Sequence, residues 1–220
     1  MCKITFKMGN LCFILFLLTS SIGCDAIIND RPIHKAAEKG NLKKVKKIID
    51  DDPTQVNIQN RLGWTPLYLA SMEGHTEVVE FLLAHNADIE LGNHMNERPL
   101  EKAAKFGHYD VVKTLLVHGA TVNCKNDFGQ IPLHWAAMWG NKEMVGLLLS
   151  YGADICAKTK YNQTPLHWAV RGDNKEVVDI LLLHGADIFA KDSNNLTPRE
   201  VALKIGLKKL AQYLQTKEEE

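Results

Sequence analysis

The chain has 220 residues, of which 45% are hydrophobic and 24% charged, so it is long enough and apolar enough to bury a sizeable core. Its 26 lysines and arginines balance its 26 aspartates and glutamates. Because the chain has no overall positive field to release counterions from a phosphate backbone, we expect no nucleic-acid partner.

The N-terminus has the layout of a secretory signal. Lys3 and Lys7 precede the apolar run LCFILFLLTSSIG, which is shorter than the roughly 20 residues that a membrane-spanning helix needs. We therefore predict a signal peptide over residues 1–23, followed by a short linker over residues 24–29.

The end of this signal, SIGC, resembles the lipobox of bacterial lipoproteins, although Ser21 stands where that pattern usually has an aliphatic residue. The resemblance implies that Cys24 is lipidated and that the protein is exported and anchored on the periplasmic or cell-surface side of a membrane. Plain secretion, with Cys24 as the first mature residue, is one alternative. An uncleaved anchor or a chance apolar start is the other.

A period of about 33 residues runs through the rest of the chain. Six prolines are spaced by 34, 33, 33, 33 and 33 residues: Pro32, Pro66, Pro99, Pro132, Pro165 and Pro198. A spacing this regular predicts a repeat architecture.

The sequence of each copy predicts a short helix, a turn, a second helix and a loop, in this order. In the second copy, Thr65 is placed to cap a helix, Pro66 suits its first turn, and Gly74 suits its left-handed end. A second helix follows, with four apolar residues on one face: Val78, Val79, Leu82 and Leu83. One helix pair cannot bury that face alone, so neighbouring pairs must stack.

Some copies depart from this punctuation. Arg31, Arg98 and Ile131 stand where the capping threonine is expected, which removes a contribution of about 1 kcal/mol from each helix start. In the fifth copy, Gly172 comes one residue early and Asp173 follows it. The first helix there either ends early or places Asp173 in the left-handed region.

Three copies resemble ankyrin repeats: GWTPLYLASMEGHTEVVEFLLAHNADI from Gly63, GQIPLHWAAMWGNKEMVGLLLSYGADI from Gly129 and NQTPLHWAVRGDNKEVVDILLLHGADI from Asn162. The match runs from about Asp30 to about Leu214. It implies an all-α ankyrin repeat solenoid of six helix-turn-helix repeats with β-turn fingers, in a bacterial protein with a signal peptide or lipid anchor. The repeat domain is expected over residues 30–217, in repeats at about 30–59, 60–92, 93–125, 126–158, 159–191 and 192–217, before an acidic tail over 218–220.

Three histidines occupy equivalent positions of their copies, at the end of the PLH motif (PIH in the first copy): His34, His134 and His167. Equivalent positions of neighbouring copies lie one repeat apart. That separation is too large for shared metal ligation. The family resemblance instead implies that they hydrogen-bond neighbouring repeats together, while metal binding and catalysis are the alternatives. Other side chains take this position in the remaining copies: Tyr68, Glu101 and Glu200.

No dinucleotide, phosphate-loop, nucleophile-elbow, HExxH or CxxC motif occurs in the sequence. We therefore expect no enzyme, no cofactor and no metal site. The predicted function is that of a monomeric, non-catalytic protein–protein interaction module.

The resemblance places partner contacts at the β-turn tips and at the exposed residues late in each first helix, on the concave side of the array. The candidate residues are aromatic, methionine or cationic: Trp64, Met72, Met95, Lys105, Phe106, Phe128, Met138, Trp139, Tyr161 and Arg171. Large apolar groups that a core does not need suggest an interaction surface. The alternative is that some fold back onto neighbouring turns, while Trp135 and Trp168 are expected to pack in the core.

The first repeat is rich in lysine, with six between Lys35 and Lys47, and three aspartates follow at residues 50–52. A solvated outer face explains this cluster. A basic patch that binds a membrane surface beside the lipid on Cys24 is the alternative.

Cys124 and Cys156 are the two cysteines beyond residue 24. An exported pair invites a disulfide bond. The family's repeat spacing, however, exceeds the roughly 4.4 to 6.8 Å between α-carbons that a disulfide tolerates, so we predict two free thiols.

Overall fold

The computed structural model describes residues 30–219; the predicted signal peptide, the linker with Cys24 and Glu220 lie outside the described residues. Within residues 30–219 the chain forms twelve α-helices, one 3₁₀-helix and no strand. The helices pair in chain order: α3 (Pro32–Glu38) with α4 (Leu42–Asp51), α5 (Pro66–Glu73) with α6 (Thr76–Ala84), α7 (Pro99–Phe106) with α8 (Tyr109–Val117), α9 (Pro132–Trp139) with α10 (Lys142–Ser150), α11 (Pro165–Arg171) with α12 (Lys175–Leu183), and α13 (Pro198–Lys204) with α14 (Lys208–Glu219).

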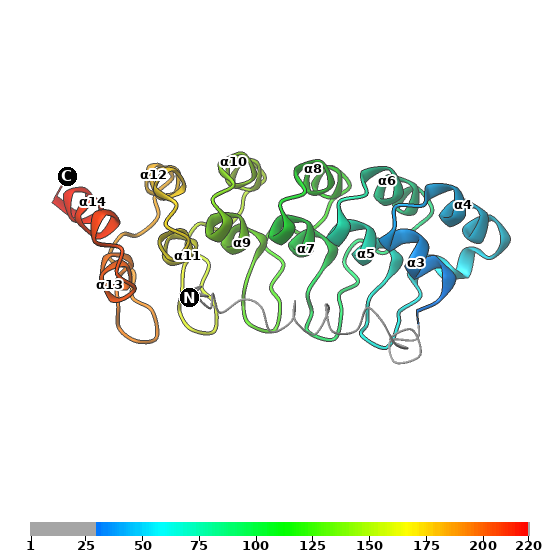
Figure 1. Ribbon diagram of the computed structural model, residues 1–220, viewed down its shortest axis with the longest axis horizontal. Coiled ribbons are helices and arrows are strands. Elements are labelled where there is room, and N and C mark those ends of the chain that lie inside the picture. Colours follow the sequence, from blue (N-terminus) through cyan, green and yellow to red (C-terminus); the bar gives the residue numbers. More distant parts are fainter. Residues whose placement is uncertain (1–29, 220) are drawn as a thin grey trace, which may run out of the picture.

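The helices form two rows along the long axis of the molecule (Figure 1). The first helix of each pair lies in one row and the second helix in the other, and the loops between pairs project as fingers beyond the row of first helices. This arrangement confirms the predicted all-helical repeat solenoid. The 3₁₀-helix η1 (Pro53–Asn57) occupies the longer loop of the first repeat and was not expected.

The capping pattern follows the sequence in most repeats. Thr65 Oγ1 accepts a hydrogen bond from the Tyr68 amide at 3.0 Å, whereas Arg31, Arg98 and Ile131 make no side-chain cap, as predicted. The PLH histidine offsets part of this loss. Arg31 and Ile131 donate their backbone N–H groups to Nδ1 of His34 and His134, at 3.0 and 3.1 Å.

The turn inside each repeat depends on left-handed backbone. Gly74 has φ of 80°, and a Cβ there would meet the His108 ring at 2.5 Å, so glycine serves both the conformation and the close approach. In the fifth repeat α11 ends at Arg171, and Asp173 takes φ of 57°. Both irregularities expected for that turn are therefore present.

Neighbouring repeats are tied together by histidines, as the family resemblance implied. Nε2 of His34, His134 and His167 lies 3.0, 3.1 and 3.2 Å from the carbonyl oxygens of Ile58, Gln163 and Leu196. Since Nδ1 accepts from the residue at the helix start, Nε2 carries the proton and donates. Burial lowers the pKa of His134 to about 4, which keeps this ring neutral.

A second set of links joins the second, third and fifth repeats to the repeat before each. Nε2 of His75 lies 2.8 Å from the Glu38 carbonyl, and Nε2 of His108 lies 2.9 Å from the Met72 carbonyl. Asn174 donates to the carbonyls of the fourth repeat in the same way, at 3.0 and 2.8 Å. The spacing of 33 residues between His75 and His108 is the sequence signal for these links.

The C-terminal helix runs two residues into the expected acidic tail. α14 continues to Glu219, and Glu218 forms an ion pair with Arg199 at 3.5 Å. Tyr213 packs between the ammonium groups of Lys175 and Lys217, at 4.0 and 5.9 Å from the ring centroid. The helix therefore closes the last repeat. No helix in the described part of the chain is long and apolar enough to cross a membrane.

Candidate functional site

The predicted partner-binding residues fall on two surfaces. The first is the fingertip row, which carries Met95, Phe128 and Tyr161 from the prediction, together with Leu62, which lies at the equivalent place one repeat earlier. All four side chains are exposed, by 40 to 61%. A polar side chain two residues before each tip fixes the turn, asparagine in three fingers and Thr159 in the fourth. Asn93 Oδ1, for example, accepts from the amides of Met95 and Glu97 at 2.9 and 3.0 Å.

The second surface is the late-helix set, formed by the last residues of the first helices. Phe106 and Trp139 are the final residues of α7 and α9, and their side chains are 49% and 61% exposed. Arg171 is exposed as well, whereas Met72, Lys105 and Met138 are half-buried. The two aromatic rings are therefore exposed to solvent and are not part of the packed core.

Trp64 differs from the rest of the predicted set. Its ring is half-buried and stacks on Tyr68, with centroids 5.8 Å apart and an interplanar angle of 14°. It lies at the base of a finger, where its ring packs against Tyr68 and is less available to a partner than the exposed residues at the tips.

The two tryptophans of the PLHW motif have different environments. Trp168 is 9% exposed and packs in the core, as expected. Trp135 is only half-buried, which differs from the expectation of a core residue. Its ring meets Trp168 edge-on at 5.0 Å, and the Lys105 ammonium lies 4.0 Å from its centroid. Its indole N–H donates to Glu101 Oε1 at 3.0 Å, so the polar edge of the ring is anchored to a buried carboxyl group while the residue as a whole stays partly exposed.

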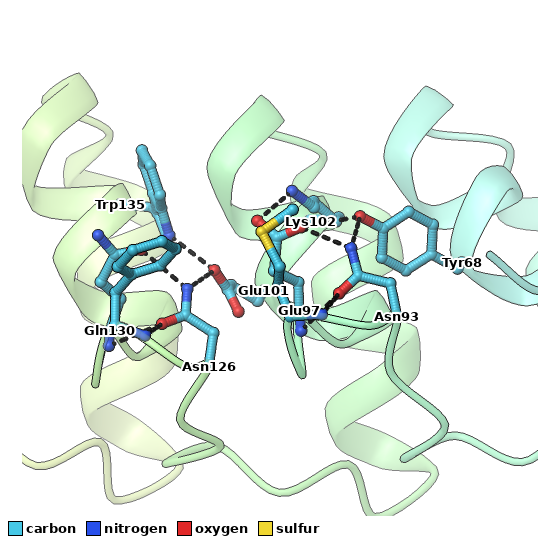
Figure 2. Close-up of polar contacts among 10 residues, drawn as sticks. Tyr68, Asn93, Glu97, Glu101, Lys102, Asn126, Gln130 and Trp135 are labelled. Carbon is cyan, nitrogen blue, oxygen red and sulfur yellow. Dashed lines mark hydrogen bonds and ion pairs between the residues drawn. The ribbon is translucent and has the colours of Figure 1, made fainter. Parts of the chain in front are cut away.

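A buried polar cluster joins side chains of α5, α7 and α9 and of the fingers between them (Figure 2). In its first half, Lys102 Nζ donates to Glu97 Oε1 at 2.5 Å, and Asn93 Nδ2 donates to Glu97 Oε2 at 2.7 Å. Tyr68 donates its hydroxyl to the same Glu97 Oε2 at 3.3 Å. A buried ammonium thus pairs with a buried carboxylate that three donors satisfy.

The second half of the cluster surrounds Glu101. Asn126 Nδ2 donates to Glu101 Oε1 at 2.7 Å, and it also lies 2.8 Å from Gln130 Oε1. The Trp135 indole N–H also donates to Glu101 Oε1, as described above. Glu101 Oε2 is buried without a hydrogen-bond partner in the structure. Tyr68 and Glu101 occupy the place of the PLH histidine in repeats two and three, so this cluster replaces the histidine link there.

The pKa values of the two carboxyl groups, Glu97 and Glu101, are shifted in opposite directions. Burial disfavours ionisation of Glu97, but Lys102 and Asn93 outweigh it and hold the pKa of Glu97 below its usual range. Burial, reinforced by the nearby Glu97 charge, raises the pKa of Glu101 to about 7. Burial also raises the pKa of Tyr68 far above its usual range. The cluster therefore contains one ion pair, Glu97 with Lys102, and one carboxyl group, that of Glu101, whose pKa lies near neutrality.

The described residues hold no group of three or more histidine, cysteine, aspartate or glutamate side chains that could bind a metal ion. Cys124 and Cys156 are both free thiols. Cys124 is buried, and burial raises its pKa to about 12, whereas Cys156 is exposed.

Comparison with known families decides the identity of the repeats. The family model for ankyrin repeats, which spans three copies, matches residues 4–93, 33–126 and 100–192. The chain belongs to the ankyrin repeat family. Ankyrin repeat proteins are generally non-catalytic scaffolds that bind other proteins.

Individual relatives match this ankyrin repeat chain over short segments. The mouse ankyrin repeat and SAM domain-containing protein 6 is 43% identical over 58 residues, which is 26% of this chain and 7% of that protein. A putative ankyrin repeat protein of the bacterium Rickettsia bellii is 33% identical over 90 residues, or 38% of this chain and 14% of that protein. The probable 26S proteasome regulatory subunit p28 of Saccharomyces cerevisiae is 38% identical over 55 residues, or 25% of this chain and 24% of that protein. The chain thus matches under a quarter of the length of each of these relatives.

Proposed function

We propose that this ankyrin repeat chain is a non-catalytic interaction module that binds a protein partner through the late-helix set and the fingertip row. The observation that carries the proposal is the exposure of Phe106 and Trp139 at the same position of consecutive repeats. Rigid aromatic side chains that the fold does not bury commonly supply most of the energy of an interface.

The polar cluster between α5, α7 and α9 supports the proposal. Glu101 accepts from the Trp135 indole, and Lys105 packs on the Trp135 ring, so side chains next to Phe106 are held in place before a partner arrives. A surface that is ordered in advance loses less conformational entropy on binding.

The experiment is affinity capture with the full chain, followed by mass spectrometry, and then by affinity measurement with the captured partner. The double variant Phe106→Ala with Trp139→Ala should weaken binding at least thirtyfold, which corresponds to about 2 kcal/mol, while its unfolding temperature stays close to the parent value. A matched control removes two exposed apolar groups from the second helices, Val117→Ala with Leu183→Ala, and should bind as the parent does. Full binding by the aromatic double variant would rule the proposal out.

We also propose that the chain is exported and anchored to a membrane through a lipid on Cys24. Four lysines of α4 support this, because all are exposed on the first repeat, nearest in sequence to the proposed anchor: Lys43, Lys44, Lys46 and Lys47. Each lysine close to an anionic surface contributes about 1 kcal/mol. In a bacterial host, labelled palmitate should enter the parent chain and not Cys24→Ser; equal labelling of both would exclude lipidation at this residue, and a secreted, unlabelled chain would favour plain secretion.

A further inference from the structure

The fingertip row presents one exposed apolar side chain per repeat over four consecutive fingers. Leu62, Met95, Phe128 and Tyr161 are separated by 33 residues each and are 40%, 46%, 44% and 61% exposed. They are not part of the buried core, so packing does not account for a large apolar group at this position in four consecutive fingers.

The tips form a fixed row because each finger is hydrogen-bonded to the next. The amides of Asp127, Lys160 and Ser193 donate to the carbonyls of Met95, Phe128 and Tyr161 at 3.0, 2.9 and 2.9 Å. One repeat earlier, His94 Nε2 lies 3.0 Å from the Arg61 carbonyl. These bonds set the spacing of the tips before any ligand binds.

The charge of the fingers is strongly positive, although the chain as a whole is neutral. The finger segments 59–65, 92–98, 125–131, 158–164 and 191–197 carry five exposed cations: Arg61, Lys125, Lys158, Lys160 and Lys191. Asp127 is their one exposed carboxylate, since Glu97 and Asp192 are buried. Other exposed acids lie outside these segments: Asp88, Asp154 and Asp187 in the loops that lead into the fingers, and Glu77, Asp110, Glu143 and Glu176 at equivalent positions of the second helices.

The spacing of the row selects the conformation of what binds it. Packed helices lie about 8 to 10 Å apart, which sets the step from one repeat to the next. A polyproline II chain advances about 3.1 Å per residue with three residues per turn, so every third side chain returns to the same face after about 9 Å. A β-strand alternates its side chains with a period of two and does not keep this register.

We propose that the fingertip row binds an extended acidic segment of a partner protein. Apolar side chains at every third position of that segment rest on successive tips, and the carboxylates between them face the lysines of the fingers. This inference rests on the proposed function, because it specifies the chemistry of the partner on one of its two surfaces.

The test is to pan a random twelve-residue peptide library against the full chain. Enriched peptides should be acidic, with apolar residues recurring at every third position. The most enriched peptide is then synthesised, and its binding is measured by fluorescence anisotropy. It should bind the double variant Phe128→Ala with Tyr161→Ala at least tenfold more weakly than it binds the parent chain. Lys158→Glu with Lys160→Glu should weaken binding by a similar factor and reduce its dependence on salt. The control Val117→Ala with Leu183→Ala should bind as the parent does.

Several outcomes would overturn the inference. Enriched peptides that are basic, or that lack apolar residues at every third position, would contradict it. Peptides that bind the fingertip variants as tightly as the parent chain would contradict it as well. An oligothymidine that competes for the same fingertips with the peptide's affinity would point to nucleic acid instead. If peptides depend on Phe106 and Trp139 alone, this inference fails while the proposed function stands, and if neither a peptide nor a captured protein depends on either surface, both fail.

Discussion

Glu101→Gln tests the electrostatics of the buried cluster. The substitution keeps the oxygen that accepts from Trp135 and Asn126 and removes the titrating proton. The carboxyl pKa is raised from 4.5 to about 7, so between these values the folded chain binds a proton that the unfolded chain has lost. The stability that Glu101 supplies is thus complete below pH 4.5 and is lost as the pH rises through 7.

The magnitude follows from the two pKa values. Between pH 5 and pH 8 the free energy of unfolding of the parent chain should fall by about 2 to 3 kcal/mol relative to Glu101→Gln. Taking the difference between the two proteins removes the contribution of the histidines, which are common to both. The residue is fully buried, so solvent screening does not reduce this effect.

The assay is urea unfolding followed by far-ultraviolet circular dichroism at pH 5, 6, 7 and 8. Glu176→Gln changes an exposed carboxyl group on α12 and should run parallel to the parent at every pH. A Glu101→Gln curve that also runs parallel to the parent would refute a buried, proton-binding Glu101. A difference of opposite sign would mean that Glu101 is ionised and paired.

Three further predictions concern the fold. Trp168→Ala should lower the free energy of unfolding by about 3 to 5 kcal/mol, and Trp135→Ala by less than half as much because its ring is half-buried; urea unfolding that finds equal losses would contradict their different burial. His134→Ala leaves the buried Ile131 N–H and the half-buried Gln163 carbonyl unpaired and should cost about 3 kcal/mol. With its pKa lowered to about 4, His134 supplies stability above pH 6.5 that is lost as the pH falls through 4, and the variant should lack that acid loss when melted across this range. A thiol reagent followed by mass spectrometry should modify Cys156 in the native chain and Cys124 only after unfolding; early modification of Cys124 would show that its repeat opens.

The sequence predicted the architecture because its determinants are local and repeated. Proline at the start of each first helix and glycine at its end recur with the period, and each acts within one turn of backbone. Asp173 was foreseen on the same grounds, since the displaced Gly172 leaves the left-handed position to the aspartate.

The buried cluster was not foreseen because it depends on contacts between repeats. Glu97 and Lys102 look like ordinary surface residues, and only the stacking of α5, α7 and α9 brings them under the surface with Tyr68. Sequence reasoning recognised Tyr68 and Glu101 as replacements for a histidine but could not supply their partners. The hydrogen bond from the Trp135 indole to Glu101 could not be predicted either, because its two partners come from neighbouring repeats.

Exposure of the candidate site was only partly readable from the pattern. The period identified which positions recur at finger tips and helix ends, and Phe106, Trp139 and Tyr161 are exposed there. The period could not show that Trp64 stacks on Tyr68, because that contact depends on the identity of a neighbour one turn away.

Hydrogen–deuterium exchange of the full chain, with and without the captured partner, tests the central claim most directly. The account predicts slower exchange over the ends of α7 and α9 and over the fingers at 92–98, 125–131 and 158–164, with little change in α6, α8, α10 and α12. Protection confined to those second helices, with unchanged exchange at the fingers and around Phe106 and Trp139, would contradict it.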